Sequence, residues 1–272
     1  MSNGPLNLSR RSFSLAFASL FLLGRAARAA GNPKGTLYPI GGNADAALWR
    51  FVQLAGGESA KIVILPHSSS SPKETVEELQ NTLMALGVRN TEVIYPGENK
   101  SLPKCTAVFM TGGDQSRMMR LIDRSMIEQL HQFLDEGNLI GGTSAGAAIM
   151  APRMIAGGMS DGMPKSKSLL INEGLGLLPG YMVDTHVSVR ARHDRLMVGL
   201  SMLPGVKGIG LDEDTAVEIK DGKATVRGKG VAHVYRRADD FKSEMPATPD
   251  GQLASVQNMV YSIYPAGETF VL

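Results

Sequence analysis

The 272-residue sequence has only one cysteine, Cys105, and a formal net charge of only +2. A single cysteine excludes a disulfide bond within the chain. Because Cys105 lies just ahead of the apolar run 107–110, we expect a buried structural thiol and not a reactive one. The near balance of charge argues against a basic surface of the kind that binds nucleic acid. What is present is the composition of an ordinary globular protein, with 43% hydrophobic and 20% charged residues.

The N-terminal segment 1–29 has the features of an export signal. An arginine pair at 10–11 precedes the apolar run 13–23, and Ala-Arg-Ala at 27–29 has the spacing of a cleavage site. The run is shorter than the about 20 residues of a transmembrane helix. The arginine pair favours twin-arginine export to the bacterial periplasm or exterior, with an ordinary secretory signal and an uncleaved anchor as alternatives. Loss of the segment changes the net charge from +2 to −2, because it carries four arginines and no acid or lysine.

The rest of the chain, 30–272, alternates between short strand-like apolar runs and longer runs with helical period, and it has no internal repeat or linker. This pattern predicts one α/β domain of three layers, with a mostly parallel twisted sheet, helices on both faces and added C-terminal β-hairpin strands. Strands are predicted at 36–40, 61–65, 91–95, 107–110, 138–141, 181–184, 208–211, 216–219, 224–227 and 231–235. Helices are predicted at 44–54, 71–86, 117–134 (as one helix or two) and 187–203. The Gly-rich segment 151–180 is predicted to be a long loop at the edge of the site.

The stretch IGGTSAGAAIM at 140–150 surrounds Ser144 with glycine and alanine. Its G-x-S-x-G pattern, after a buried strand and before a helix, is typical of a nucleophilic serine on a strained bend, where small neighbours avoid clashes. A Gly-rich turn before a small-residue helix would look the same. Parallel sheets bind ligands at the carboxyl ends of their strands, so the loops 41–43, 67–68 and 112–115 are expected beside Ser144.

A serine nucleophile needs a base and an orienting acid within hydrogen-bonding distance. His186 ends a predicted strand and is the first candidate for the base, with His67 in reserve, although a histidine that only caps a strand is the structural alternative. The acid is one of the three residues 212–214, which also follow a predicted strand. The other histidines are expected on the surface or in structural positions: His131 and His193 within helices and His233 in a C-terminal strand. No spacing of histidines indicates a metal site or any cofactor.

Four motifs in order resemble a known family. They are GGDQ at 112–115, GGTSAGA at 141–147, DTHVSVRARHDRL at 184–196 and GIGLDEDTAVEI at 208–219. All four are similar to the motifs of cyanophycinase and its relatives around dipeptidase E. Those proteins are serine peptidases, and the resemblance implies their flavodoxin-like fold, which is shared with the class I glutamine amidotransferases. The order serine, histidine, acid also differs from that of α/β-hydrolases.

The resemblance implies a role for each matching residue. Ser144 would be the nucleophile, His186 the general base and Glu213 the residue that orients it. The main-chain amides of Gly113 and Ala145 would form the oxyanion hole. The matching substrate-binding residues are Gln115, Asp184, Thr185, Arg190, Arg192 and Arg195.

Two features bear on the substrate. Arg192 and Arg195 are three apart on a predicted helix and share one face, and guanidinium groups suit carboxylates, although a solvated basic face is the alternative. Thr185 stands where cyanophycinases commonly have a glutamine, and the shorter side chain without an amide is expected to preserve catalysis but to alter subsite preference.

The sequence therefore predicts an exported serine exopeptidase that releases β-Asp-Arg dipeptides from cyanophycin. The alternatives are a peptidase of aspartyl or isoaspartyl dipeptides and a periplasmic binding protein without catalytic activity. The expected partner is the peptide or polymer substrate, without nucleic acid, membrane or metal, and the resemblance implies a homodimer.

Overall fold

The computed structural model of the protein describes residues 34–158, 169–244 and 254–272. The predicted export signal at 1–29 lies outside these residues. None of the helices within the described ranges has both the length and the apolar character needed to cross a bilayer. The elements, in chain order, are β1 (Thr36–Ile40), α1 (Asp45–Ala55), η1 (Gly57–Ser59), β2 (Lys61–Leu65), α2 (Pro72–Ala85), β3 (Asn90–Val93), β4 (Ala107–Met110), α3 (Gln115–Leu121), α4 (Arg124–Asp135), β5 (Leu139–Thr143), α5 (Ala145–Ala148), β6 (Arg153–Gly157), β7 (Leu170–Glu173), β8 (Tyr181–Thr185), α6 (His193–Ser201), β9 (Lys207–Leu211), β10 (Thr215–Lys220), β11 (Lys223–Gly228), β12 (Val231–Glu244), β13 (Ser255–Pro265) and β14 (Thr269–Val271).

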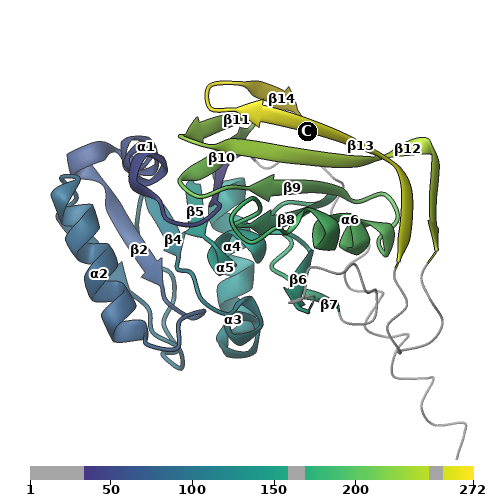
Figure 1. The fold of residues 1–272 in the computed structure, drawn as a ribbon. Helices are drawn as coiled ribbons and strands as arrows, with labels where there is room; N and C mark the ends of the chain where they lie inside the picture. Colours follow the sequence, from purple (N-terminus) through teal and green to yellow (C-terminus); the bar gives the residue numbers. More distant parts are fainter. Residues whose placement is uncertain (1–33, 159–168, 245–253) are drawn as a thin grey trace, which may run out of the picture. The chain divides into compact units, whose positions relative to one another are not determined.

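The largest sheet within the described ranges has eight strands in the order β14-β11-β10-β1-β5-β4-β2-β3 (Figure 1). The strands from β1 to β3 in this order run parallel to one another, and β10, β11 and β14 extend the other side with antiparallel pairs. Residues 221–222 form the turn between β10 and β11, and both have positive φ, as the Asp-Gly pair predicts. The mostly parallel sheet with added C-terminal strands is thereby confirmed.

Helices cover both faces of this sheet, and neighbouring residues along its strands pack into different buried clusters as a result. Along β2, Val63 and Leu65 belong to one buried cluster, whereas Ile62 and Ile64 belong to another. Successive side chains of a strand point to opposite faces, so a continuous apolar run supplies both clusters. The cluster with Ile62 packs against α1 and α2, and the cluster with Val63 packs against α3 and α4.

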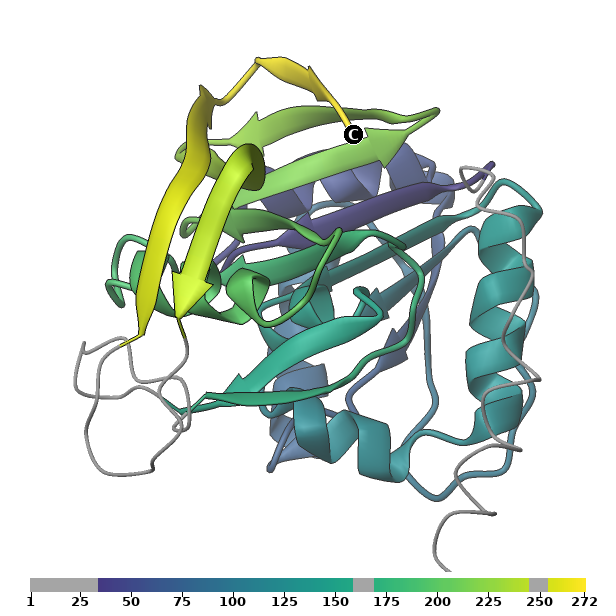
Figure 2. The same cartoon turned by 90° about the vertical axis from the view of Figure 1, so that its right-hand side faces the viewer.

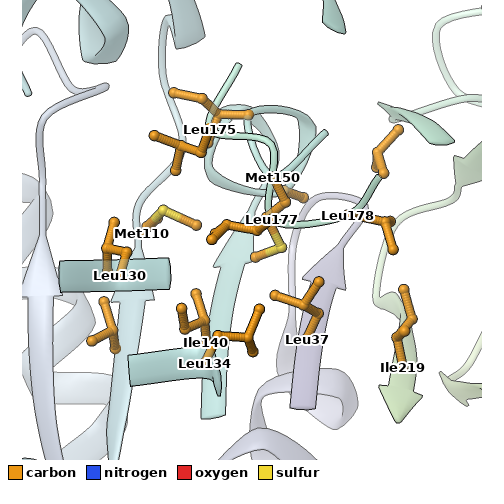
Figure 3. Packing of buried hydrophobic residues seen from close by; sticks show 14 of the residues in the cluster. Leu37, Met110, Leu130, Leu134, Ile140, Met150, Leu175, Leu177, Leu178 and Ile219 are labelled. Carbon is orange, nitrogen blue, oxygen red and sulfur yellow. The ribbon is translucent and has the colours of Figure 1, made fainter. Parts of the chain in front are cut away.

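A non-helical segment, 175–178, completes the cover on the α4 side. Figure 3 shows Leu175 and Leu177 on the side of Met110 and Ile140 of the sheet, whereas Leu178 lies toward Ile219 of β10. This segment follows β7 and precedes β8, so its burial also fixes where β8 begins. The start of the strand that precedes His186 is therefore tied to the core.

A second sheet, which the sequence pattern does not predict, contains the strands on either side of α6. Its order is β13-β12-β9-β8, with β8 and β9 parallel. Figure 2 shows β12 and β13 side by side, and their antiparallel pairing extends from Val231 to Glu244. The apolar periodicity locates β8, β9 and the start of β12, but it carries no information about which sheet each strand joins.

Two predicted elements are wrong in the structure. The segment 151–180 is not one long loop, because β6 and β7 pair antiparallel within it. The helix predicted at 187–203 begins only at His193, since residues 187–191 form a turn in which Ala191 has a φ of 49°. The predicted helix 117–134 is indeed divided, between α3 and α4.

We expect Phe51→Ala to lower the free energy of unfolding by about 3–5 kcal/mol, because it leaves a cavity in the cluster beneath α1. The Phe51 side chain is 0% exposed and packs edge-on against Phe109 with ring centroids 5.0 Å apart. Urea denaturation of the purified variant measures the change. Trp49→Ala on the same helix is the matched control, because Trp49 is 53% exposed and its loss should change stability by less than about 0.5 kcal/mol. Equal losses in the two variants would contradict this packing.

Candidate active site

Ser144 occupies a strained bend between β5 and α5. Its φ of 52° and ψ of −113° lie outside the regions that non-glycine residues favour. The surrounding hydrogen bonds hold it there, since its N–H donates to the carbonyl of Ile40 at 2.9 Å and its carbonyl accepts from the N–H of Ala148 at 3.0 Å. The bend places the hydroxyl at the carboxyl end of β5, next to the end of β1.

Close backbone contacts explain the small residues around this serine. A Cβ on Gly146 would lie 2.2 Å from the carbonyl oxygen of Met110, and a Cβ on Gly142 would lie 2.6 Å from the carbonyl oxygen of Gly146. Neither distance is possible for a side chain. α5 is only four residues long, so main-chain amides near the bend, and not a long helix dipole, are the groups available to stabilise negative charge.

Three polar side chains from separate loops meet at this bend. The Ser144 Oγ lies 2.8 Å from Nε2 of His186, and Nδ1 of His186 lies 2.5 Å from Oε1 of Glu213. The ring of His186 therefore bridges a hydroxyl and a carboxylate, one on each nitrogen. We call these residues the Ser–His–Glu set.

The main chain of the loop after β1 holds His186 and Glu213, which are the two distal members of the set, counted from Ser144. The N–H of His186, which has a φ of 56°, donates to the carbonyl of Gly41 at 2.9 Å. The N–H of Asn43 donates to Oε2 of Glu213 at 2.6 Å. Between them, a Cβ on Gly42 would lie 1.8 Å from Oε2 of Glu213 and 2.7 Å from Cε1 of His186. A glycine at position 42 is therefore required for the carboxylate and the imidazole to meet.

The three consecutive acids 212–214 have three different environments. Glu213 faces His186, whereas Asp214 accepts from the N–H of Ala47 at the start of α1 and pairs with Lys229 at 3.2 Å. Asp212 accepts from the N–H of Ser188 at 3.0 Å. The strand-end position marks all three alike, whereas the structure gives each a different partner.

The remaining histidines do not join the set. His67 is buried and is absent from the pocket lining, and burial lowers its pKa. His131 contacts the carbonyl of Leu175 at 2.8 Å, and His193 contacts the hydroxyl of Tyr235 at 2.5 Å. These two side chains are partly buried and hydrogen-bonded, so the expectation of simple surface positions is wrong.

A pocket opens beside Ser144. It contains Ser144, both predicted oxyanion-hole residues and all six predicted substrate-binding residues, which places side chains from motifs up to 82 positions apart around one cavity. Ala156 and Gly157 of β6 also line it; the sequence placed segment 151–180 at the edge of the site but did not single out these two residues. The lining residues are Gly113, Asp114, Gln115, Ser144, Ala145, Ala148, Ala156, Gly157, Asp184, Thr185, Arg190, Arg192 and Arg195.

The three pocket arginines have different partners. Arg195 makes a bidentate contact with Asp184, with Nε 2.7 Å from Oδ2 and Nη2 2.5 Å from Oδ1. Arg192 donates to the carbonyl of Thr185 at 2.9 Å and lies 3.8 Å from the carboxylate of Asp184. Arg190 is exposed, and no acceptor within the described ranges bonds its guanidinium group. Arg190 is therefore the arginine most open to a ligand.

Burial and like charge act together on Arg192. Burial lowers its pKa, the neighbouring guanidinium of Arg195 lowers it further, and Asp184 only partly opposes these effects, so the pKa falls to about 10. Arg192 remains cationic at neutral pH. Because it precedes α6 as the N-terminal cap residue, it does not share a helix face with Arg195 as predicted.

Hydrogen bonds hold the side chain of Gln115 and the main chain of Thr185. The amide of Gln115 donates to the carbonyl of Ile155 in β6 at 2.5 Å. The N–H of Thr185 donates to Oδ1 of Asp184 at 2.8 Å.

Within the described ranges, His, Cys, Asp and Glu residues form no group of three or more that could hold a metal ion.

A model of Peptidase family S51 matches residues 40–227, which include the entire pocket. The chain belongs to peptidase family S51. S51 membership makes it a serine-type peptidase. The matched range also includes Ser144, His186 and Glu213.

Similar S51 proteins are cyanophycinases. The chain is 32% identical to the cyanophycinase of Synechococcus elongatus over 256 residues, which cover 88% of this chain and 80% of that protein. It is 38% identical to the cyanophycinase of Geminocystis herdmanii over 218 residues, with 74% and 80% coverage. A solved structure of a peptidase from an acI-B1 Actinobacterium superposes with a TM-score of 0.64 at 18% identity, covering 89% of this chain and 98% of that one, which shows the shared fold.

We expect Arg195→Ala to lower the free energy of unfolding by about 3 kcal/mol, because it leaves the carboxylate of Asp184 buried without its bidentate partner. The side chain of Asp184 is 3% exposed and that of Arg195 is 11% exposed. Urea denaturation measures the loss. Arg190→Ala is the control, because its exposed side chain should leave stability within about 0.5 kcal/mol of the starting value.

The double variant Asp184→Asn/Arg195→Ala should recover part of the loss, since it removes the unpaired charge. If Arg195→Ala unfolds at the same urea concentration as the unchanged protein, the pair does not stabilise the fold and Arg195 is available to bind ligand instead.

Proposed function

We propose that the Ser–His–Glu set is the catalytic machinery of this peptidase. The supporting observation is the pair of hydrogen bonds on the two ring nitrogens of His186, at 2.8 Å to Ser144 and 2.5 Å to Glu213. This arrangement lets the imidazole accept the hydroxyl proton while the carboxylate fixes the ring and stabilises its cation.

The reaction then proceeds in two steps. The Oγ of Ser144 attacks the scissile carbonyl as His186 Nε2 takes its proton, and His186 returns the proton to the leaving amine. Water, deprotonated by the same nitrogen, hydrolyses the acyl-enzyme and releases Ser144. The amides of Gly113 and Ala145 are the proposed donors to the tetrahedral oxyanion, each contributing roughly 3–4 kcal/mol.

We infer cyanophycin as the substrate, cleaved from one end into β-Asp-Arg dipeptides. Two findings support it. The relatives at 32–38% identity are cyanophycinases. Arg190 and Arg192 also line the same pocket as Ser144, and guanidinium groups are suited to bind the free carboxylate of a polyaspartate backbone.

Thr185 favours a second candidate, a peptidase of aspartyl or isoaspartyl dipeptides. The residue lines the pocket and provides no side-chain amide for a polymer substrate. Release of β-Asp-Arg from cyanophycin, compared with hydrolysis of short aspartyl and isoaspartyl dipeptides, separates the two candidates.

Purified protein should release soluble β-Asp-Arg from insoluble cyanophycin, and Ser144→Ala should reduce the rate by at least about 1,000-fold, because it removes the attacking oxygen. Mass spectrometry of the soluble products measures both. Arg190→Ala, in contrast, should mainly raise KM, because binding by a guanidinium group stabilises substrate and transition state alike.

The Ser144→Ala protein must melt within a few degrees of the unchanged protein for the comparison to hold. If the unchanged protein hydrolyses isoaspartyl dipeptides and leaves cyanophycin intact, the polymer substrate is wrong and the dipeptide candidate replaces it.

We further propose that residues 1–29 direct twin-arginine export of the folded enzyme. Changing the arginines at 10–11 to lysines should move the protein from the periplasm to the cytoplasm of an expressing bacterium, because the route recognises the arginine pair. Cell fractionation and immunoblotting measure the distribution. Unchanged periplasmic protein in the lysine variant would indicate an ordinary secretory signal.

A further inference from the structure

Asp212 connects the two loops that carry the distal members of the Ser–His–Glu set. It directly precedes Glu213, yet its Oδ1 accepts from the N–H of Ser188, two residues after His186, at 3.0 Å. The adjacent backbone contact, from the N–H of Val187 to the carbonyl of Leu211, is 3.2 Å long. One carboxylate therefore links the loop after β8 to the loop after β9.

His233 of β12 holds this carboxylate from the other side. Its Nε2 lies 3.1 Å from Oδ1 of Asp212, and its Nδ1 lies 2.7 Å from the hydroxyl of Tyr261 in β13. His233 is 4% exposed and stacks against the Tyr261 ring with an angle of 10° between the planes. Both ring nitrogens are engaged and the ring is fixed, so His233 is in turn a rigid support for Asp212.

The ionisation of Asp212 agrees with this geometry. Burial raises its pKa, but the hydrogen bonds from His233 and Ser188 outweigh burial, and the net pKa lies below the ordinary value of an aspartate. Asp212 is thus a carboxylate at neutral pH, with its hydrogen bonds to the two loops intact. None of its contacts is to the pocket, and it is absent from the pocket lining.

We propose that Asp212 is a positioning residue. By accepting from Ser188, it joins the loop that carries His186 to the loop that carries Glu213, and so keeps His186 within hydrogen-bonding distance of both Ser144 and Glu213. The inference rests on the proposed catalytic function of the Ser–His–Glu set. Since an error of about 1 Å in the placement of a catalytic group can reduce a rate about 100-fold, a link of this kind affects catalysis without contacting substrate.

The test uses a fluorophosphonate, which reports on the activation of Ser144 and needs no knowledge of the peptide substrate. In this reaction the serine oxygen forms a bond to phosphorus as the phosphorus–fluorine bond breaks, fluoride leaves and the hydroxyl proton passes to His186. Asp212→Ala should lower the maximal labelling rate about 10- to 100-fold, with the concentration for half-maximal rate changed by less than about threefold.

Two variants make the result specific. Asp212→Asn keeps an acceptor for the N–H of Ser188 and should retain a labelling rate within about threefold of the unchanged protein. Glu218→Ala is the matched control, because Glu218 is also a partly buried carboxylate with two arginine partners, Arg50 and Arg227, but it lies outside the pocket. It should change the melting temperature and leave the labelling rate unaltered.

The outcomes separate the two proposals. If the unchanged protein is not labelled at Ser144, or Ser144→Ala is labelled equally fast, the catalytic function itself is wrong. If the unchanged protein is labelled and Asp212→Ala matches its rate, the positioning role is overturned. An equal loss in Glu218→Ala, or a loss in Asp212→Asn as large as in Asp212→Ala, also overturns it, because neither follows from a lost bond to Ser188.

Discussion

A serine hydroxyl attacks a peptide only where a base can take its proton, and in this protein the contact between Ser144 and His186 meets that requirement. The two residues come from different sheets, since β5 belongs to the eight-stranded sheet and β8 to the four-stranded one. The 2.8 Å between hydroxyl and imidazole therefore depends on how these sheets pack. The hydrogen bonds of Gly41 to His186 and of Asn43 to Glu213 tie the loops after β8 and β9, both strands of the second sheet, to the loop after β1.

The pocket follows from the same arrangement. Its walls come from the segments after β4 and β5, from β6, and from the end of β8 with the turn that follows it. Its positive charge comes from two arginines of that turn and one of α6. The pairing of Arg195 with Asp184 fixes the turn from within the fold, which leaves Arg190 and Arg192 nearer to solvent. Three arginines that look equivalent in the sequence thus have unequal capacities for binding a carboxylate.

Sequence patterns predict the parallel strands, the bend at Ser144 and the strand-end position of His186, because each follows from local periodicity or from the rule for strand ends. They do not distinguish Glu213 from its neighbours, because all three acids follow one strand, and only the resemblance to a family made the choice. The second sheet, the late start of α6 and the lining role of Ala156 depend on tertiary pairing. No local signal encodes such pairing.

The missing Cβ at position 42 has a consequence for reading other sequences of this type. Any side chain there would displace either the carboxylate or the imidazole, so a chain with G-x-S-x-G but a larger residue at the equivalent position cannot assemble the same machinery. One glycine far upstream of the serine thereby becomes a marker. Under the proposed role of the Ser–His–Glu set, it distinguishes homologues that can form this set from those that have kept only the bend at the serine.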